Sequence, residues 1–142
     1  MAYTITINVL QGLFPPKRFT IVERTAQSGV DWAVDSADGL LTMKMTNSGS
    51  SGVLRFKSGT SQFIVACGVH NYKRWCDIIP DLEASKTAML THPLYYKEDS
   101  PLYKKLWDQG SKFEVTDKAG TKIAINFDVA EGNDLKATIT IN

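Results

Sequence analysis

Cysteine is scarce in this sequence. Cys67 and Cys76 are the two cysteines among 142 residues, and their spacing forms no CxxC motif. Small secreted scaffolds use many disulfides because they cannot bury enough apolar surface, and a chain of this length has no such need. A disulfide scaffold is therefore excluded, and reduced thiols in a cytosolic protein are expected.

An excess of charge of one sign is also missing. Sixteen Lys and Arg residues stand against fifteen Asp and Glu residues, which gives a formal net charge of +1. A chain this close to neutral lacks the electric field that gathers phosphate backbones or anionic lipids. The short basic stretch Lys73-Arg74-Trp75 is typical of ordinary solvated surface. We therefore expect no nucleic-acid partner.

Long apolar runs are absent too. None approaches the ~20 residues that a membrane-spanning helix needs. The residues after Met1 alternate between apolar and polar, unlike the basic region and apolar block of a signal peptide. The sequence therefore predicts no transmembrane segment, no secretory leader and a cytoplasmic location.

The chain does contain enough apolar residues for one core. With 142 residues, 43% of them hydrophobic, it is the size of one globular domain, and we expect a single domain over residues 1–142. Runs rich in apolar or alternating residues predict many short strands. These runs lie at residues 3–9, 19–23, 40–45, 53–56, 63–67, 113–115, 123–129 and 135–141.

Turn-forming residues separate these runs. Gly, Asp, Asn and Ser cluster at residues 35–39, 57–60, 117–120 and 131–134, where hairpin turns are expected. The small, polar segment 47–52 predicts a flexible hairpin loop. Its two glycines would let another molecule approach the backbone closely.

Two short helices are predicted in the middle of the chain. After Pro80, Asp81 is in position to cap a helix that runs through Met89 and ends before Pro93. A second helix is expected to begin near Pro101 and to contain Leu102, Leu106 and Trp107. Many short strands around one helical insertion predict a mainly β fold: an antiparallel two-sheet β-sandwich with a short central helix–loop–helix connection.

Residues 68–78, GVHNYKRWCDI, hold the densest group of recognition side chains. No period of two or of 3.6 runs through them, so we expect the end of a strand that turns into a loop. Asn71 and Asp77 suit the hydroxyls of a sugar, and the rings of Tyr72 and Trp75 suit its apolar C–H face. Each hydrogen bond to a sugar hydroxyl contributes only about 0.5–1.5 kcal/mol, so useful avidity requires several sites and predicts a homo-oligomer.

Two other chemistries are conceivable for the same segment, an enzyme site and a metal site. His70, Cys76 and Asp77 are the residue types of a base, a nucleophile and an orienting carboxylate, but no activating motif surrounds the thiol. The same three residues lack the spacing of known metal ligands, and the other histidine is His92. Structural roles for these side chains are favoured over an enzyme or a metal site.

Residues 68–78 also resemble the signature of the fungal fruiting-body lectins of the common-mushroom type. Shorter similar motifs follow in the same order along most of the chain. They are Tyr3-Thr4-Ile5-Thr6, Val22-Glu23-Arg24-Thr25, Leu41-Thr42-Met43, Ser48-Gly49, Ser51-Gly52-Val53-Leu54-Arg55-Phe56, Tyr95-Tyr96 and Ala130-Glu131-Gly132-Asn133-Asp134-Leu135. The resemblance implies an actinoporin-like two-sheet sandwich, assembly as a tetramer or dimer, and reversible sugar binding without catalysis, cofactor or metal.

The resemblance further implies a primary site for galactosyl-β1,3-N-acetylgalactosamine, the T-antigen disaccharide of mucin-type O-glycans. Glycoproteins and glycolipids that carry galactose or N-acetylgalactosamine would then be the partners. Ser48, Gly49 and Asn71 would hydrogen-bond the sugar, while His70 and Tyr72 would shape the pocket. A backbone contact is expected at Ser28 or Gly29, in a loop shorter than the family's. Residues 44–47 also replace a tight glycine pair, which narrows the cleft or favours another glycan.

A second site of the resembling family takes terminal N-acetylglucosamine. Asp77 and Ile78 match two of its positions. Pro80 replaces a threonine, an arginine position falls near Tyr103 or Lys104, and Phe113 replaces a tyrosine. Hydroxyl and guanidinium donors are lost, so we expect this second site to be weakened or to bind something different.

Taken together, the sequence predicts a cytoplasmic, non-enzymatic, oligomeric lectin that acts in defence against organisms that ingest its producer. The alternative is a membrane-active, pore-forming protein, which an actinoporin-like architecture permits. Such a protein needs an insertable amphipathic segment, and residues 3–9 are typical of a strand that is already paired.

Overall fold

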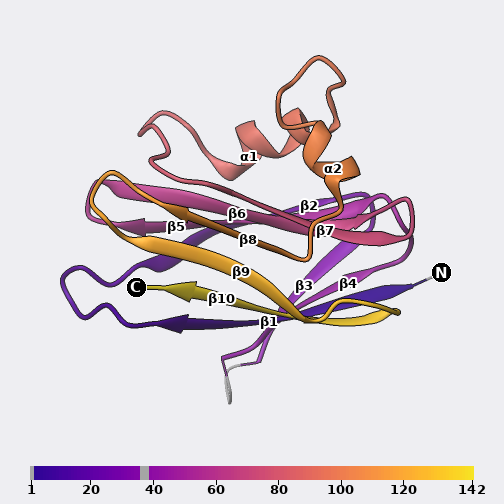
Figure 1. Ribbon diagram of the computed structural model, residues 1–142, viewed down its shortest axis with the longest axis horizontal. Helices are drawn as coiled ribbons and strands as arrows, with labels where there is room; N and C mark the ends of the chain where they lie inside the picture. Colours follow the sequence, from indigo (N-terminus) through magenta and orange to yellow (C-terminus); the bar gives the residue numbers. More distant parts are fainter. Residues whose placement is uncertain (1, 36–38) are drawn as a thin grey trace.

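A computed structural model describes residues 2–35 and 39–142 of the chain. Two β-sheets pack face to face, and a thin helical layer covers the outer face of one of them (Figure 1). The predicted two-sheet sandwich with a short helical connection is confirmed. Part of the turn predicted at residues 35–39 lies outside the described residues.

The larger sheet has six strands in the order β3-β4-β1-β10-β9-β8. Their bounds are β1 Tyr3–Gln11, β3 Val30–Val34, β4 Leu41–Met45, β8 Lys112–Thr116, β9 Lys122–Val129 and β10 Asp134–Ile141. Neighbouring strands are antiparallel except β1 and β10, which run parallel with Ile5 opposite Leu135. The first and last strands of the chain therefore meet in the middle of this sheet.

The smaller sheet has four strands in the order β2-β5-β6-β7, all antiparallel. Their bounds are β2 Thr20–Gln27, β5 Ser50–Ser58, β6 Ser61–His70 and β7 Lys73–Ile79. The predicted hairpins at residues 57–60 and 117–120 join β5 to β6 and β8 to β9. Residue 50 already belongs to β5, so the loop predicted at 47–52 is shorter than expected.

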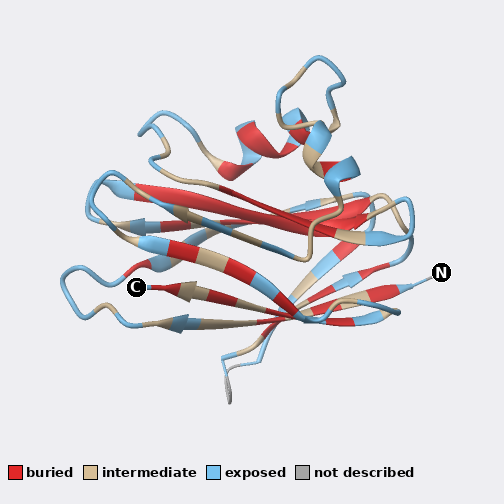
Figure 2. Ribbon diagram, viewed as in Figure 1, coloured by how far each residue is buried: buried red, intermediate tan, exposed pale blue. Residues whose placement is uncertain are grey.

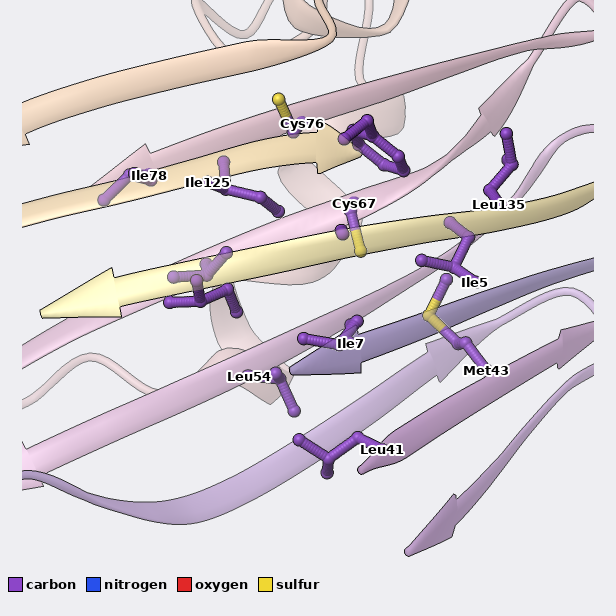
Figure 3. Packing of buried hydrophobic residues seen from close by; sticks show 14 of the residues in the cluster. Ile5, Ile7, Leu41, Met43, Leu54, Cys67, Cys76, Ile78, Ile125 and Leu135 are labelled. Carbon is purple, nitrogen blue, oxygen red and sulfur yellow. The ribbon is translucent and has the colours of Figure 1, made fainter. Parts of the chain in front are cut away.

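The main core lies between the two sheets. In β1, alternate residues Tyr3, Ile5 and Ile7 point inward, and Figure 2 shows the same alternation of buried and less buried residues along β9 and β10. Figure 3 shows Ile5, Ile7 and Met43 of the larger sheet in one layer with Leu54 and Cys67 of the smaller sheet. Burying this apolar surface is the main source of stability, at roughly 25 cal/mol per Å².

A second core lies between the smaller sheet and the helical layer. Val53, Ile64 and Trp75 face outward from the sheet and pack with Tyr95 and Leu106. The inner strands β5, β6 and β7 are therefore buried on both faces, so they lose the apolar–polar alternation, whereas β2 at the edge of the sheet keeps it. For this reason the prediction of a loop after Gly68 is wrong: β6 continues to His70 and β7 begins at Lys73.

The helical layer consists of α1 Ala88–Thr91, the 3₁₀ helix η1 His92–Tyr96 and α2 Lys104–Asp108. The prediction that Asp81 caps a helix is wrong, because Thr87 caps α1 by accepting a hydrogen bond from the Leu90 amide at 3.1 Å. Asp81 has a φ of 51° and accepts from the Lys118 amide. α1 ends at Thr91, before Pro93 as predicted, and Pro93 lies in the first turn of η1.

Glu23 of β2 fastens the helical layer to the smaller sheet. Its carboxylate accepts hydrogen bonds from the Ala88 and Met89 amides at 2.7 and 3.0 Å, and it pairs with Arg55 at 2.7 Å. These two amides are otherwise unpaired at the start of α1, so the contact satisfies them. Within residues 2–35 and 39–142, no helix has the length and apolar character required to cross a membrane.

Candidate functional site

The site is built on the tight turn between β6 and β7. His70 and Lys73 pair across the turn, and Asn71 and Tyr72 between them have φ values of 49° and 68°. Two left-handed residues are what a two-residue type I′ turn requires. Asn tolerates this conformation well, whereas Tyr does so at a cost. The turn therefore presents an amide and an exposed ring at the end of the sandwich.

A second segment lies against this turn. The Ser48 hydroxyl accepts a hydrogen bond from the Tyr72 amide at 2.9 Å, and the Gly49 amide donates to the Val69 carbonyl at 2.8 Å. Gly49 has a φ of 91°, which glycine adopts without strain. The two loops predicted to form a common site are thus hydrogen-bonded to each other.

Gly68 allows the strands behind these loops to approach closely. A Cβ atom on Gly68 would lie 2.4 Å from the Ser50 carbonyl oxygen and 2.5 Å from the Ser51 Cβ. Any larger residue would push the beginning of β5 away from β6. Because Ser50 directly follows Gly49, this close contact also sets the position of the segment at 48–49.

Six residues line an open cavity of about 320 Å³ at this end of the molecule. Five of them are predicted site residues, and the sixth is Trp107 of α2. The lining residues are Ser48, Gly49, His70, Asn71, Tyr72 and Trp107. A volume of this size is at the lower end of the range for small-molecule sites, ~300–1,000 Å³.

The sequence predicts the helix that contains Trp107 but not the place of this residue beside the cavity. Its ring meets the His70 ring at a right angle, with 4.4 Å between ring centroids. Leu106 beside it is fully buried, while 52% of Trp107 is exposed. No local pattern in the sequence indicates this place, because it depends on how α2 packs over the smaller sheet. Burial lowers the pKa of His70, so its ring is neutral near pH 7.

The predicted residues Ser28 and Gly29 do not line this cavity. They lie one step behind it, because the Ser28 carbonyl accepts a hydrogen bond from the Ser50 hydroxyl at 2.6 Å. The Gly29 carbonyl accepts from the Thr46 amide at 3.4 Å. Both residues are left-handed, with φ values of 58° and 74°. They therefore support the segment that carries Ser48 and Gly49.

A buried polar network connects the same segment to the helical layer. His92 contacts the Thr25 hydroxyl through Nδ1 at 2.7 Å and the Ser51 hydroxyl through Nε2 at 2.8 Å. Ser51 also contacts the Tyr96 hydroxyl at 2.6 Å, which in turn donates to the Gly49 carbonyl at 3.4 Å. Burial lowers the pKa of His92 to about 4, so the ring is neutral at pH 7. The network ends on the backbone of a cavity residue.

The residues of the second predicted site are divided between two layers. Ile78 lies in the core of the sandwich, whereas Asp77 lies under the helices and accepts a hydrogen bond from the Tyr95 hydroxyl at 2.7 Å. The ammonium group next to Asp77, at 3.5 Å, belongs to Lys105, which follows the predicted Tyr103 and Lys104. Burial raises the pKa of Asp77, although Tyr95 and Lys105 act against this effect.

The remaining residues of this group have different surroundings. The Lys105 ammonium lies 3.7 Å from the centre of the Phe113 ring, so Asp77 and Phe113 share one cationic neighbour. Tyr103 packs at the edge of the second core, Lys104 is exposed and Pro80 is half-buried. The structure thus groups Asp77 with Phe113 through Lys105.

The alternative enzyme and metal sites gain no support from the geometry. Cys76 points into the sandwich core, where burial and the adjacent Asp77 carboxylate raise its pKa to about 12. A thiol held protonated in this way is a poor nucleophile. Among the described residues, no group of three or more His, Cys, Asp or Glu side chains is arranged to hold a metal ion.

Comparisons with known proteins give a consistent result. The model of the family described as fungal fruit body lectin matches residues 1–139. Boletus edulis lectin, from Boletus edulis, is 40% identical over 143 aligned residues, which cover 98% of each chain. The crystal structure of wild-type Xerocomus chrysenteron lectin is 37% identical and superposes with a TM-score of 0.92 over 100% of both chains. The crystal structure of a mutated form of the same lectin superposes with the same TM-score, and the match covers 99% of the mutated chain.

Proposed function

Because the chain belongs to the fungal fruit body lectin family, a family of carbohydrate-binding proteins, we propose that the cavity at 48–49 and 70–72 binds saccharides of the galactose and N-acetylgalactosamine type. The T-antigen disaccharide, galactosyl-β1,3-N-acetylgalactosamine, is the specific ligand of this proposal. Binding is reversible, and the saccharide leaves chemically unchanged.

The observation that carries the proposal is the combination of polar and aromatic groups around one small cavity. The Ser48 hydroxyl, the Gly49 backbone and the Asn71 amide offer donors and acceptors that match sugar hydroxyls. Tyr72 and Trp107 offer exposed rings for the apolar face of the sugar. With a neutral His70, the cavity carries no formal charge of its own, which favours a neutral ligand.

We further propose that N-acetylglucosamine binding at the second group is weakened. Asp77 is already engaged by Tyr95 and Lys105, and the Phe113 ring is covered by the Lys105 ammonium. A sugar that reached these groups would have to displace the existing contacts. The energy of each new hydrogen bond would then be offset by the loss of one already made.

Avidity makes a homo-oligomer, a tetramer or a dimer, part of the proposal. A shallow polar site binds sugars in the micromolar to millimolar range, so several cavities must act together on a glycan-bearing surface. Leu10, Val22 and Val34 are exposed apolar side chains that contacts between subunits would cover. Cross-linking of surface glycans by such an oligomer is the basis of the proposed role in defence.

The rival pore-forming function gains no support from the first strand. β1 lies between β4 and β10 and buries alternate residues in the core, so its release would expose the centre of the larger sheet.

The two free thiols, Cys67 and Cys76, are buried, which supports a protein kept in a reducing, cytoplasmic compartment.

A glycan array with competition tests the proposal. We expect binding to O-glycans that end in galactosyl-β1,3-N-acetylgalactosamine, and inhibition by free galactose. Asn71→Gly removes the amide and keeps the left-handed turn, so it should abolish this binding while the unfolding midpoint stays nearly constant. Binding by Asn71→Gly at the wild-type level would contradict the assigned cavity. Turnover of any glycan on long incubation would contradict the non-enzymatic assignment.

A further inference from the structure

Trp107 differs from the other two tryptophans of the chain in its exposure. Trp75 is fully buried beneath the helical layer, and Trp32 is half-buried with its indole N–H donated to the Thr25 carbonyl at 2.8 Å. Trp107 leaves 52% of its surface exposed at the edge of the cavity. A ligand that covered this ring would remove apolar surface from water, which is favourable.

Two contacts fix where this ring lies. The perpendicular packing on His70, at 4.4 Å between centroids, holds the indole against a cavity residue. Two residues further on, the Gln109 side-chain amide donates to the His70 carbonyl at 2.8 Å, and Gln109 ends α2 in a left-handed conformation with a φ of 50°. The indole is therefore held in place before any ligand arrives, which lowers the entropy cost of binding.

The two parts of the cavity wall also differ in chemistry. Ser48, Gly49 and Asn71, from the loops of the sandwich, supply hydroxyl, backbone and amide groups. Trp107, from α2, supplies an apolar ring surface. A pyranose ring with hydroxyls along its edge and C–H groups on one face requires both kinds of surface.

We propose that Trp107 is the platform for the apolar face of the bound sugar and that it makes the cavity prefer galactose-type over glucose-type rings. This inference rests on the proposed function of the cavity. In galactose the axial hydroxyl at C4 leaves the C–H groups of C3, C4 and C5 on the same face. In glucose the equatorial hydroxyl turns the C4–H to the other face, so the apolar patch is smaller.

Calorimetric titration with methyl galactoside and methyl glucoside tests the platform. Trp107→Ala should weaken galactoside binding about tenfold and glucoside binding much less, so that the preference between them falls. Trp107→Phe keeps a smaller ring and should lose about two- to threefold. Phe14→Ala is the matched control, because Phe14 is an exposed aromatic outside the cavity lining and its removal should leave both affinities unchanged.

Tryptophan fluorescence gives a second, local readout. Galactoside should shift the emission of the wild-type protein to shorter wavelength, and Trp107→Phe should lose this shift while it still binds. Wild-type affinity and preference in Trp107→Ala, or unchanged emission at saturation, would overturn the platform while the proposed function stands. Failure of the wild-type protein to bind galactosides or the disaccharide would instead overturn the proposed function.

Discussion

At the scale of single residues, the β6–β7 turn combines backbone strain with two of the proposed sugar-binding residues. Asn71 and Tyr72 both have positive φ, but only asparagine is common in that conformation. Tyr72 is 74% exposed, so its ring gains little from packing in the free protein. Residues kept in unfavourable conformations are concentrated at functional sites. The strained tyrosine is therefore consistent with a residue retained for its ligand.

Tyr72→Asn should stabilise the protein and weaken sugar binding. Asparagine adopts a φ near 68° more easily, so the free energy of unfolding should rise by about 0.5–1 kcal/mol. The exposed ring at the cavity is lost at the same time, so affinity should fall. Urea unfolding and calorimetric titration of the same variant measure the two effects. A variant that is less stable than wild type would contradict the strain assigned to Tyr72.

At the scale of structural elements, the helical layer supports the segment at 48–49 through buried polar contacts. The Thr25, His92, Ser51 and Tyr96 side chains connect β2, η1 and β5 and end on the Gly49 carbonyl. Such a network stabilises only when each member is satisfied. A charge on His92 would leave one ring N–H without an acceptor or force a hydroxyl to turn.

Stability should therefore fall between pH 7.5 and pH 5. The His92 side chain has its ordinary pKa of 6.5 in the unfolded chain, whereas burial lowers this pKa to about 4 in the folded protein, so the unfolded state binds more protons between these values. The contribution of neutral His92 to the free energy of unfolding is fully present above pH 6.5. It decreases as the pH falls toward 4, by up to about 3 kcal/mol. Asp77, with its raised pKa, acts in the opposite direction only at the acidic end.

Urea unfolding at a series of pH values measures this effect, and His92→Gln serves as the comparison. Glutamine does not titrate, so the free energy of unfolding of His92→Gln should change less between pH 7.5 and pH 5 than that of the wild-type protein. This holds even if the variant is less stable at pH 7.5. Parallel curves for the two proteins would show that other groups are responsible.

The elements differ in how far the sequence alone predicts them. The alternation in residues 3–9 and 135–141 identifies strands because only one face of the larger sheet is buried. The same rule fails for 73–79, where Trp75 and Asp77 face the helices while Cys76 and Ile78 face the sandwich. The order of strands is also not encoded locally, and nothing in the spacing indicates that β1 and β10 pair in parallel.

The candidate site was predictable to the extent that it depends on short loop motifs. Ser48, Gly49 and residues 70–72 were identified through a family resemblance, and they do line one cavity. Trp107 was missed because its position depends on how α2 packs over β6 and β7, a tertiary arrangement with no local signal. The role of Ser28 as a support through Ser50 has the same origin.

At the scale of the whole molecule, both predicted loops line the same cavity of about 320 Å³, so the proposal gives each chain one primary site. Binding to a glycan-coated surface should therefore depend on assembly. Light scattering should give a mass two or four times that of the chain. Agglutination of cells that carry the disaccharide should need this assembled form, and a monomeric protein that agglutinates equally well would contradict the multivalent mechanism.

The central claim is that the loops at 48–49 and 71–72 bind the sugar. Amide chemical shifts recorded by NMR during titration with galactosyl-β1,3-N-acetylgalactosamine test it most directly. The largest changes should occur at Ser48, Gly49, Asn71 and Tyr72, and the Trp107 indole N–H should also move. Changes confined to the opposite end of the sandwich, around Thr60 and Gly120, or no changes at saturating disaccharide, would contradict the account.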